Sequence, residues 1–213
     1  MKNEESSFSA EFLHLKNKPR LIVRQKFEIA EMLGIETRNK YQVVDQDNQP
    51  VAFVAEQKKG FLALLLRQWI GHWGKLEFYV FNSLRQKVLR VHQPFRFFWQ
   101  RLEVHDANGV FLGAIQQRFS FFIKRFDIED SQGQVLMDVS SRFFRQWAFS
   151  FRRGEEQVVS IRKKWDGILT EIFTDKDSFV IEFADGEISE AERNLVLCAA
   201  LFIDLRYYEV KAS

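Results

Sequence analysis

The residues near the end of the chain constrain the fold most, because they predict one helix that is apolar on every side. Leu195 to Ile203 is an uninterrupted apolar run, and Ser189 with Glu192 three residues later forms a capping box that marks a helix start. We expect a helix over residues 189–208. A helix without a polar face must be surrounded by protein or by lipid.

The length of the apolar run favours protein as its surroundings. Its nine residues extend about 14 Å, whereas a membrane span needs about 20 apolar residues. Arg193 before the run and Asp204 and Arg206 after it add charges that disfavour a span. We therefore predict that the helix fills the interior of the domain. The side chains expected to be buried there are Leu195, Val196, Cys198, Ala199, Leu201 and Phe202.

The rest of the chain predicts a succession of antiparallel hairpins. Short apolar-alternating segments are separated by turns that Asp or Asn opens and Gly closes, as in Asp106–Gly109 and Asp130–Gly133. About twelve such strands follow from Leu21 onwards, and the later hairpins recur about every 24 residues. So many antiparallel strands normally close, which removes exposed edges. We therefore predict an all-β protein, a closed, roughly twelve-stranded antiparallel barrel around a buried C-terminal helix.

The N-terminal residues and the single cysteine bear on domains and compartment. Residues 1–20 form a polar segment without the apolar stretch of a secretory signal, and residues 21–213 form one barrel domain. One cysteine excludes an internal disulfide framework, and the place of Cys198 in the apolar helix predicts a buried thiol. These features predict a cytoplasmic protein, or one bound peripherally to the cytosolic face of a membrane.

The connections between strands are of two chemical kinds. In a meander the connections alternate between the two ends of the barrel, so one end collects the polar hairpin turns. The other end collects residues 60–73, 94–99, 118–125 and 142–147, which all combine Phe or Trp with Arg or Lys. Because side chains alternate along a strand, adjacent rings such as Phe121 and Phe122 cannot both face the core. Some of these rings are therefore expected outside the core.

This aromatic and basic end has two interpretations. At a membrane, the rings enter the headgroup boundary and the cations attract anionic lipid, at about 1 kcal/mol per charge. Alternatively, the rings cap the barrel and the arginine stems lie over them. The membrane interpretation predicts an anionic phospholipid membrane as the partner. Its contact residues would be Leu64, Leu65, Arg67, Trp69, Trp73, Arg96, Phe98, Trp99, Phe122, Arg142 and Arg145.

Two segments resemble the phospholipid scramblase family. Residues 163–183 contain the pattern K-x-W-x-G-I-L-x-E-x-F-T-D-x-D-x-F-x-I-x-F, and the helix ends with Asp204 and Glu209 at the family's spacing. Residues 25–41 resemble the opening strand pair of the family, up to Tyr41. The resemblance implies a twelve-stranded barrel around a central helix, shared with tubby-like proteins, and energy-independent translocation of phospholipids.

The chain departs from the family pattern in its cysteines. Animal members of the family carry cysteine clusters, sites of lipid acylation, in the connections described above. This chain has Phe, Trp and Leu there instead. We interpret these residues as side-chain anchors that stand in place of acyl anchors.

The resemblance also implies calcium binding, at an acidic segment that matches residues 175–186. A calcium loop of the EF-hand type needs oxygen ligands at positions 1, 3, 5, 9 and 12. Asp175 and Asp177 supply the first two, but Phe179 and Phe183 occupy positions 5 and 9 and Gly186 occupies position 12. The alternation instead predicts an acidic turn entering a strand. We expect no cofactor, and Asp175 and Asp177 are calcium candidates by resemblance alone.

No motif in the chain predicts catalysis. It contains no G-x-G-x-x-G, P-loop, G-x-S-x-G or H-E-x-x-H pattern, and its four histidines lack metal-ligand spacing. A net charge of +2 argues against a nucleic-acid partner, and no feature identifies a protein partner. Three functions stay open: a scramblase-like protein acting on phospholipids, a peripheral tubby-like lipid-binding module without transport, and a protein-interaction domain.

Overall fold

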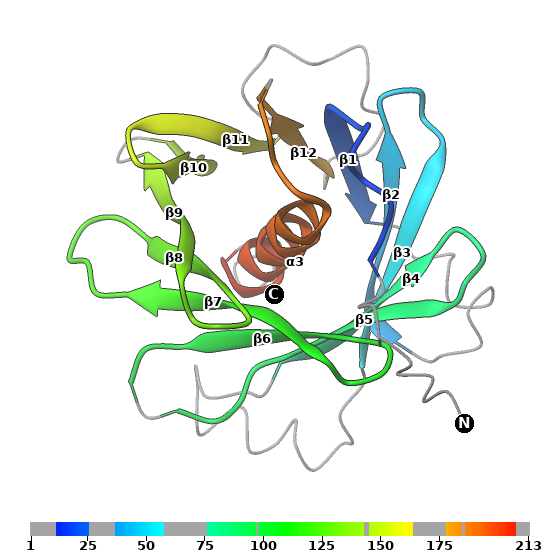
Figure 1. Ribbon diagram of the computed structural model, residues 1–213, viewed down its shortest axis with the longest axis horizontal. Helices are drawn as coiled ribbons and strands as arrows, with labels where there is room; N and C mark the ends of the chain where they lie inside the picture. Colours follow the sequence, from blue (N-terminus) through cyan, green and yellow to red (C-terminus); the bar gives the residue numbers. More distant parts are fainter. Residues whose placement is uncertain are drawn as a thin grey trace, which may run out of the picture.

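The computed structural model describes residues 12–25, 37–57, 76–96, 98–142, 145–163, 178–184 and 186–207. Within them, twelve antiparallel strands form a closed barrel around one helix, α3, as Figure 1 shows. The predicted all-β barrel around a C-terminal helix is therefore confirmed. The elements are β1 (Arg20–Gln25), β2 (Thr37–Asp45), β3 (Pro50–Gln57), β4 (Glu77–Asn82), β5 (Lys87–His92), β6 (Arg101–Asp106), β7 (Phe111–Arg118), β8 (Arg125–Asp130), β9 (Val135–Arg142), β10 (Arg145–Arg153), β11 (Glu156–Lys163), β12 (Ser178–Phe183) and α3 (Glu190–Tyr207).

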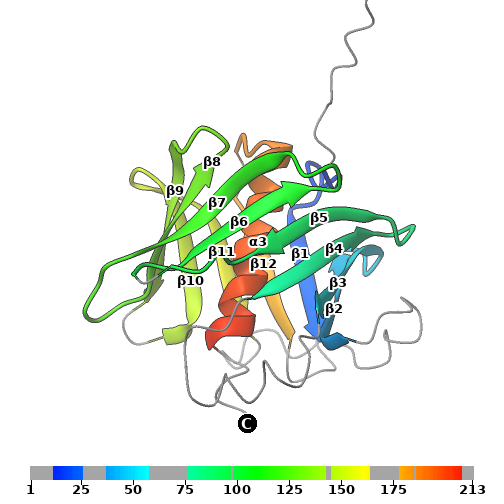
Figure 2. The same ribbon diagram turned by 90° about the horizontal axis from the view of Figure 1, so that it is seen from below.

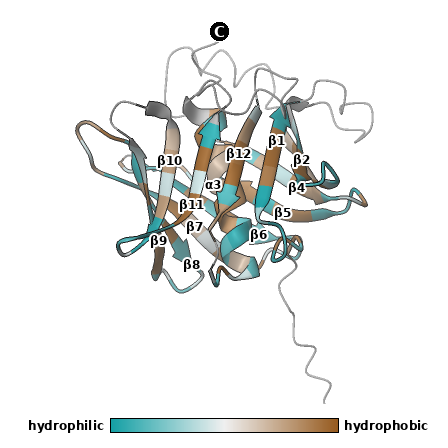
Figure 3. Ribbon diagram, turned by 90° about the horizontal axis from the view of Figure 1, so that it is seen from above, coloured by the Kyte–Doolittle hydropathy of each residue, from teal (hydrophilic) through white to brown (hydrophobic). Residues whose placement is uncertain are grey.

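Each strand pairs with its neighbours in sequence, and the first and last strands close the ring. In that closing pair Leu21 lies opposite Ile181 and Val23 lies opposite Phe179, all four of them buried. Hydrophobic and hydrophilic residues alternate along the strands, as the colours of Figure 3 show. Because the pleat sends successive side chains to opposite faces, Leu21 and Val23 face the core, and Ile22 between them belongs to a small separate apolar cluster with Val44 and Val180.

Four hairpin turns at one end of the barrel, here called the turn end, share one design. In each, an Asp or Asn side chain accepts a hydrogen bond from the backbone N–H four residues later, as Asp106 does from Val110 at 2.8 Å. The four opening residues are Asp45, Asn82, Asp106 and Asp130. The residues three positions later have left-handed backbones and are Asn48, Arg85, Gly109 and Gly133. The spacing of 24 residues between the last three turns is the recurrence seen in the sequence.

Helix α3 passes through the barrel, as seen from the side in Figure 2. The predicted capping box is present: Glu192 N–H donates to Ser189 Oγ at 3.2 Å, and Ser189 N–H donates to Glu192 Oε2 at 2.8 Å. All residues from Leu195 to Ile203 are at most 2% exposed, and burial raises the pKa of the Cys198 thiol. No helix within the described residues is long and apolar enough to cross a bilayer.

The barrel wall and the helix are in close contact at two places. The rings of Phe126 and Phe202 meet edge to face, with centroids 5.9 Å apart. At Gly113 of β7 an added Cβ would lie 2.3 Å from the backbone oxygen of Glu129 and 3.0 Å from Leu195 Cδ1. Only glycine therefore allows β7 to approach β8 and the helix this closely.

Residues 12–19 lie across the start of α3 at the turn end. Asn194 holds Leu13 through two backbone hydrogen bonds of 3.0 Å, and Arg193 Nη1 donates to the backbone oxygens of Leu15 and Lys18. The Arg193 guanidinium lies 4.2 Å from the centroid of the Phe183 ring, and burial lowers its pKa. The helix start is thus covered by the chain itself.

Candidate membrane-contact site

The end of the barrel opposite the turn end carries a cluster of exposed aromatic rings. They lie on two connections, β5 to β6 and β7 to β8, which are close together because β6 pairs with β7. Figure 2 shows the β7–β8 connection reaching away from the barrel wall. We call these rings the aromatic tip; its members and their exposed fractions are Phe95 53%, Phe98 80%, Trp99 48%, Phe119 57%, Phe121 81% and Phe122 82%.

The rings of the two connections touch one another. Trp99 meets Phe119 edge to face with centroids 5.4 Å apart, and this contact joins the β5–β6 connection to the β7–β8 connection. Phe119 in turn meets Phe121 at 4.5 Å, and Phe121 lies 6.4 Å from Phe122. Edge-to-face pairs at these distances are attractive. Four of the six rings, those of Trp99, Phe119, Phe121 and Phe122, therefore form one continuous chain of contacts, and Phe95 and Phe98 lie on the same β5–β6 connection as Trp99.

Four of the contact residues predicted from the sequence lie in this region. Arg96, Phe98, Trp99 and Phe122 are all exposed, which agrees with their prediction as surface residues; membrane contact itself stays a prediction. The sequence reasoning had not selected three further members of the tip, which are Phe95, Phe119 and Phe121. Their signal was present, since each belongs to a segment already identified as aromatic and basic.

The other predicted residues divide into two groups. Arg142 ends β9 and Arg145 begins β10, and the two are opposite one another in the register at the same end of the barrel. The remaining candidates lie outside the described residues; they are Leu64, Leu65, Arg67, Trp69, Trp73, Asp175 and Asp177.

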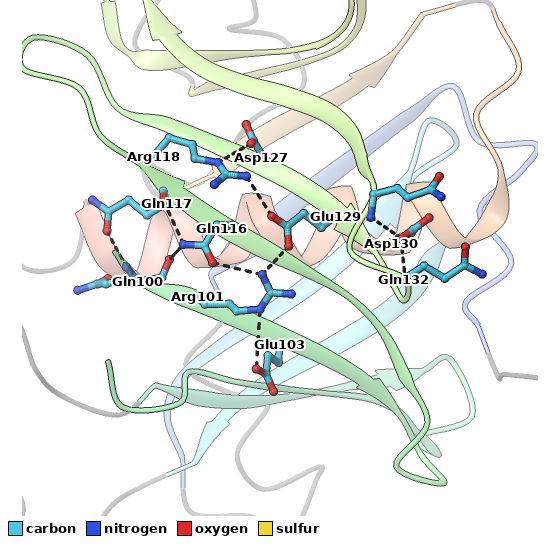
Figure 4. Close-up of polar contacts among 11 residues, drawn as sticks. Gln100, Arg101, Glu103, Gln116, Gln117, Arg118, Asp127, Glu129, Asp130 and Gln132 are labelled. Carbon is cyan, nitrogen blue, oxygen red and sulfur yellow. Dashed lines mark hydrogen bonds and ion pairs between the residues drawn. The ribbon is translucent and has the colours of Figure 1, made fainter. Parts of the chain in front are cut away.

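A network of polar side chains lies directly behind the tip, on the outer face of β6, β7 and β8 (Figure 4). Arg101 Nη1 donates to Glu129 Oε2 at 2.5 Å, and Arg118 Nη2 donates to Glu129 Oε1 at 3.1 Å. Arg118 Nε also donates to Asp127 at 2.5 Å. We call this network the polar base; it consists of Gln100, Arg101, Gln116, Gln117, Arg118, Asp127 and Glu129.

The polar base holds the roots of the two connections together. Gln100, just before β6, donates its N–H to Gln117 Oε1 at 3.2 Å and accepts a bond of 2.8 Å from the Gln117 N–H. The Gln116 amide donates to the backbone oxygens of both residues. Glu129 is largely buried and accepts charge-assisted hydrogen bonds from two arginines. These bonds fix the side chains of the polar base relative to one another. The two connections that carry the tip are therefore held at a fixed distance from each other where they join the barrel.

The charges near the tip are unevenly compensated. The guanidinium groups of Arg101 and Arg118 are neutralised by carboxylates of the polar base. Arg96 and Arg125 are exposed beside the tip, and neither forms an ion pair within the described part of the chain. These two cations are available to an anionic ligand.

The potential metal ligands of the described residues are dispersed over the structure. Among them, no three His, Cys, Asp or Glu side chains are grouped so that they could hold a metal ion. The nearest arrangement is a pair of histidines on the outer face, His92 and His105, with ring centroids 5.1 Å apart and Glu103 beside His92. Burial, followed by the neighbouring His92, lowers the pKa of His105.

The turn end differs in its exposed apolar residues. Within the described residues, the large exposed apolar side chains of the turn end are aliphatic: Leu84, Val110 and Val135. They lie in three separate turns or at the edge of one. Single exposed aliphatic residues are ordinary on a protein surface, whereas six exposed rings on two neighbouring connections are typical of an interaction site.

Fold and site together define a class: a closed antiparallel barrel filled by its own C-terminal helix, with an aromatic surface on the connections at one end. The model of the Scramblase family matches residues 4–210. The chain therefore belongs to the scramblase family.

Curated relatives agree with this assignment. A phospholipid scramblase family protein of Schizosaccharomyces pombe is 25% identical over 80% of this chain and 49% of its own length. Human phospholipid scramblase 1 is 25% identical over 91% of this chain and 64% of its own length. The chain thus spans about half to two thirds of the length of these two relatives. No solved structure matches it.

Proposed function

We propose that this protein binds phospholipid membranes peripherally, at their cytosolic face, with the aromatic tip as its contact surface. The observation that carries the proposal is the group of six exposed rings, four of them in mutual contact, beside two exposed arginines that form no ion pair within the described residues. Aromatic rings with neighbouring cations suit the boundary between acyl chains and anionic headgroups. Membership in the scramblase family supports phospholipid as the ligand.

The energies are sufficient for reversible binding. Moving one ring of the tip partly out of water contributes on the order of 1–2 kcal/mol, from about 25 cal/mol per Å² of apolar area. Arg96 and Arg125 would each add about 1 kcal/mol of attraction to anionic lipid, which salt weakens. Several rings acting together would therefore hold the barrel on a bilayer without an acyl anchor.

Energy-independent translocation of phospholipids is the second candidate function, and family membership favours it. Within the described residues α3 occupies the barrel interior from Leu195 to Ile203, which disfavours a route for lipid through the barrel. If this protein scrambles lipids, we expect it to do so by perturbing the leaflet from outside. We assign no catalytic chemistry to either function.

The proposal is tested by sedimentation with vesicles of phosphatidylcholine alone and of equal parts phosphatidylcholine and phosphatidylserine. We expect binding that rises with phosphatidylserine and weakens with salt. A Trp69→Ser/Trp73→Ser variant tests the remaining predicted anchors and should bind less. If the wild type does not bind anionic vesicles at low salt, the proposal is wrong. The tip would then serve either as a cap of the barrel or as a surface that binds protein.

A parallel assay separates binding from translocation. Fluorescent phospholipid is placed in both leaflets of the same vesicles, and a membrane-impermeant reductant bleaches the outer leaflet only. Loss of about half of the signal means that no translocation occurs, since only one of two leaflets is accessible, and complete loss in intact vesicles means translocation. Binding without transport is therefore shown by half loss in vesicles with which the protein sediments. Running the assay with and without calcium would show whether the ion controls either activity.

A further inference from the structure

The backbone of Trp99 is unusual for its residue type. Its φ is 49°, in the left-handed region that large side chains rarely adopt. Three turns of the same barrel place Gly109, Gly133 and Gly154 at their left-handed positions, where glycine has no steric cost. A tryptophan at such a position reduces stability, and residues held in this way concentrate at ligand-contacting sites.

The Trp99 side chain is only about half buried within the protein, so a large part of its ring remains for another contact. It is 48% exposed, and its contact with Phe119 joins it to a ring that is itself 57% exposed. Beyond Phe119 the chain of contacts leads to Phe121 and Phe122, which are more than four fifths exposed. The unfavourable backbone therefore serves to hold an aromatic cluster together at the surface, where a ligand outside the protein can cover it.

We propose that Trp99 is the positioning and anchoring residue of a preformed wedge, which enters the glycerol and upper acyl region of one phospholipid leaflet. This inference rests on the proposed membrane binding and specifies how it occurs. The ligand is the apolar boundary of the lipid, exposed where headgroups are loosely packed, and not a particular headgroup. Tryptophan suits this depth because its ring is apolar and its N–H remains able to donate a hydrogen bond.

The charges of the site support an apolar contact. Arg101 and Arg118, the cations of the polar base, are already paired with Glu129, and Arg96 and Arg125 beside the tip form no ion pair within the described residues. Insertion of rings is not screened by salt, whereas attraction between exposed charges is. The wedge should therefore supply the part of membrane binding that persists at high salt.

The polar base sets the depth of insertion. Glu129 and Gln116 are buried polar groups within a hydrogen-bonded network, and this network begins at Gln100, the residue that follows Trp99. Moving that network into hydrocarbon would remove charged groups from water at high cost. The wedge therefore penetrates one leaflet only to the level of its rings, and the base lies among the headgroups.

The chain offers a matched pair of substitutions for testing this. Trp99→Gly and Arg85→Gly both place glycine at a left-handed position, with φ of 49° and 64°, but at opposite ends of the barrel. Glycine removes the steric cost in both cases, so each variant should melt at or above the wild-type temperature. A large fall in the melting temperature of Trp99→Gly alone would show that its ring is a structural cap, and the proposal would be wrong.

Binding is then measured at high salt with small, highly curved phosphatidylcholine vesicles, whose headgroups are loosely packed and carry no net charge. We expect wild type and Arg85→Gly to bind equally and Trp99→Gly to bind about tenfold more weakly, the effect of withdrawing one large ring. Equal binding by all three proteins would overturn the proposal. So would a wild type that binds anionic vesicles at low salt but not these vesicles, although the proposed function would then stand.

A second measurement locates the ring directly. Lipids brominated near the glycerol end of the acyl chain quench tryptophan fluorescence only on close contact. We expect Trp99→Phe to bind vesicles like wild type. Its tryptophan fluorescence should be quenched by the brominated lipid to a smaller extent than that of wild type, because the ring in contact with lipid has been removed. Undiminished quenching in Trp99→Phe would place Trp99 outside the bilayer and contradict the proposal. Failure of the wild type to bind any vesicle would contradict the proposed function itself.

Discussion

The hydroxyl of Tyr41 donates a hydrogen bond of 3.0 Å to Asp204 Oδ2, across 163 residues of sequence. Tyr41 lies on β2 and Asp204 lies in the last two turns of α3, and both side chains are almost completely buried. The bond therefore fixes the end of the helix against the barrel wall. Both residues belong to the pattern that resembles the scramblase family, and their contact gives a structural reason for finding them together.

The first prediction concerns this contact. Tyr41→Phe keeps the ring but removes the donor to a buried carboxylate, and it should reduce the free energy of unfolding by about 1–3 kcal/mol. Chemical denaturation measures the change. Tyr79→Phe is the control, because Tyr79 makes a comparable bond of 3.1 Å to Glu77 on the outer, partly exposed face and should cost less. If Tyr41→Phe and Tyr79→Phe reduced the free energy of unfolding equally, the buried bond to the helix would contribute no more than an ordinary surface bond.

A second prediction concerns the helix inside the barrel. Leu201 is fully buried, so Leu201→Asp would place an unpaired carboxylate in an apolar interior at a cost of several kcal/mol or more. We expect this variant not to fold, which circular dichroism and thermal melting would show. Cooperative melting near the wild-type temperature would contradict the placement of α3 in the core.

A third prediction concerns pH. Burial alone would raise the pKa of Asp45, but hydrogen bonds from Lys18 and the backbone of Gln49, with the Lys18 charge, hold it below its usual value. The folded protein therefore binds this proton more weakly than the unfolded chain does. The stabilisation is present above the unfolded pKa of about 3.9 and is lost as pH falls through the lower, folded value.

Asp45→Asn measures that contribution, because it removes the charge but keeps an acceptor for the turn. Wild type should be the more stable protein at neutral pH, and the difference should shrink when the pH falls below about 4. Asp130→Asn makes the same change in a turn of the same design, where no described lysine or arginine pairs with the carboxylate. A difference for Asp45→Asn that stayed constant down to pH 2 would contradict the assignment to its carboxylate.

The fourth prediction concerns calcium. Residues 175–186 lack oxygen side chains at three positions that a calcium loop needs, so millimolar calcium should leave the melting temperature unchanged. Differential scanning calorimetry with calcium, and with magnesium as the control, tests this. A dose-dependent rise that disappears in Asp175→Asn would show that the segment is a metal loop.

Sequence patterns predicted the strands and the helix because each depends on local chemistry. The 24-residue recurrence of Asx-opened turns located the hairpins, and Ser189 with Glu192 located the helix start. The apolar run from Leu195 could be assigned to protein and not to a membrane from its length alone. These features are periodicities and caps, which a sequence displays directly.

Contacts between distant residues were not predictable in the same way. Segments 94–99 and 118–125 were identified as aromatic, but their union into one tip through Trp99 and Phe119 depends on the pairing of β6 with β7. The left-handed backbone of Trp99 has no sequence signal, since tryptophan does not favour it. Likewise, the segment 1–20 was described as polar, and the sequence did not indicate that Leu13 and Leu15 would join the core or that Asn194 would bind the backbone of Leu13.

Membrane contact by the aromatic tip can be tested by substituting exposed apolar residues at each end of the barrel. Phe98→Ser/Phe122→Ser alters the tip, and Leu84→Ser/Val135→Ser removes the two largest exposed aliphatic surfaces of the turn end, although these are smaller than the two rings. Both pairs are exposed, so both variants should keep the wild-type melting temperature.

Sedimentation at low salt with equal parts phosphatidylcholine and phosphatidylserine then compares the three proteins. We predict that wild type and the turn-end variant bind alike and that the tip variant binds at least about tenfold more weakly, as expected for two rings contributing on the order of 1 kcal/mol each. A folded tip variant that sediments with vesicles as wild type does would contradict the account.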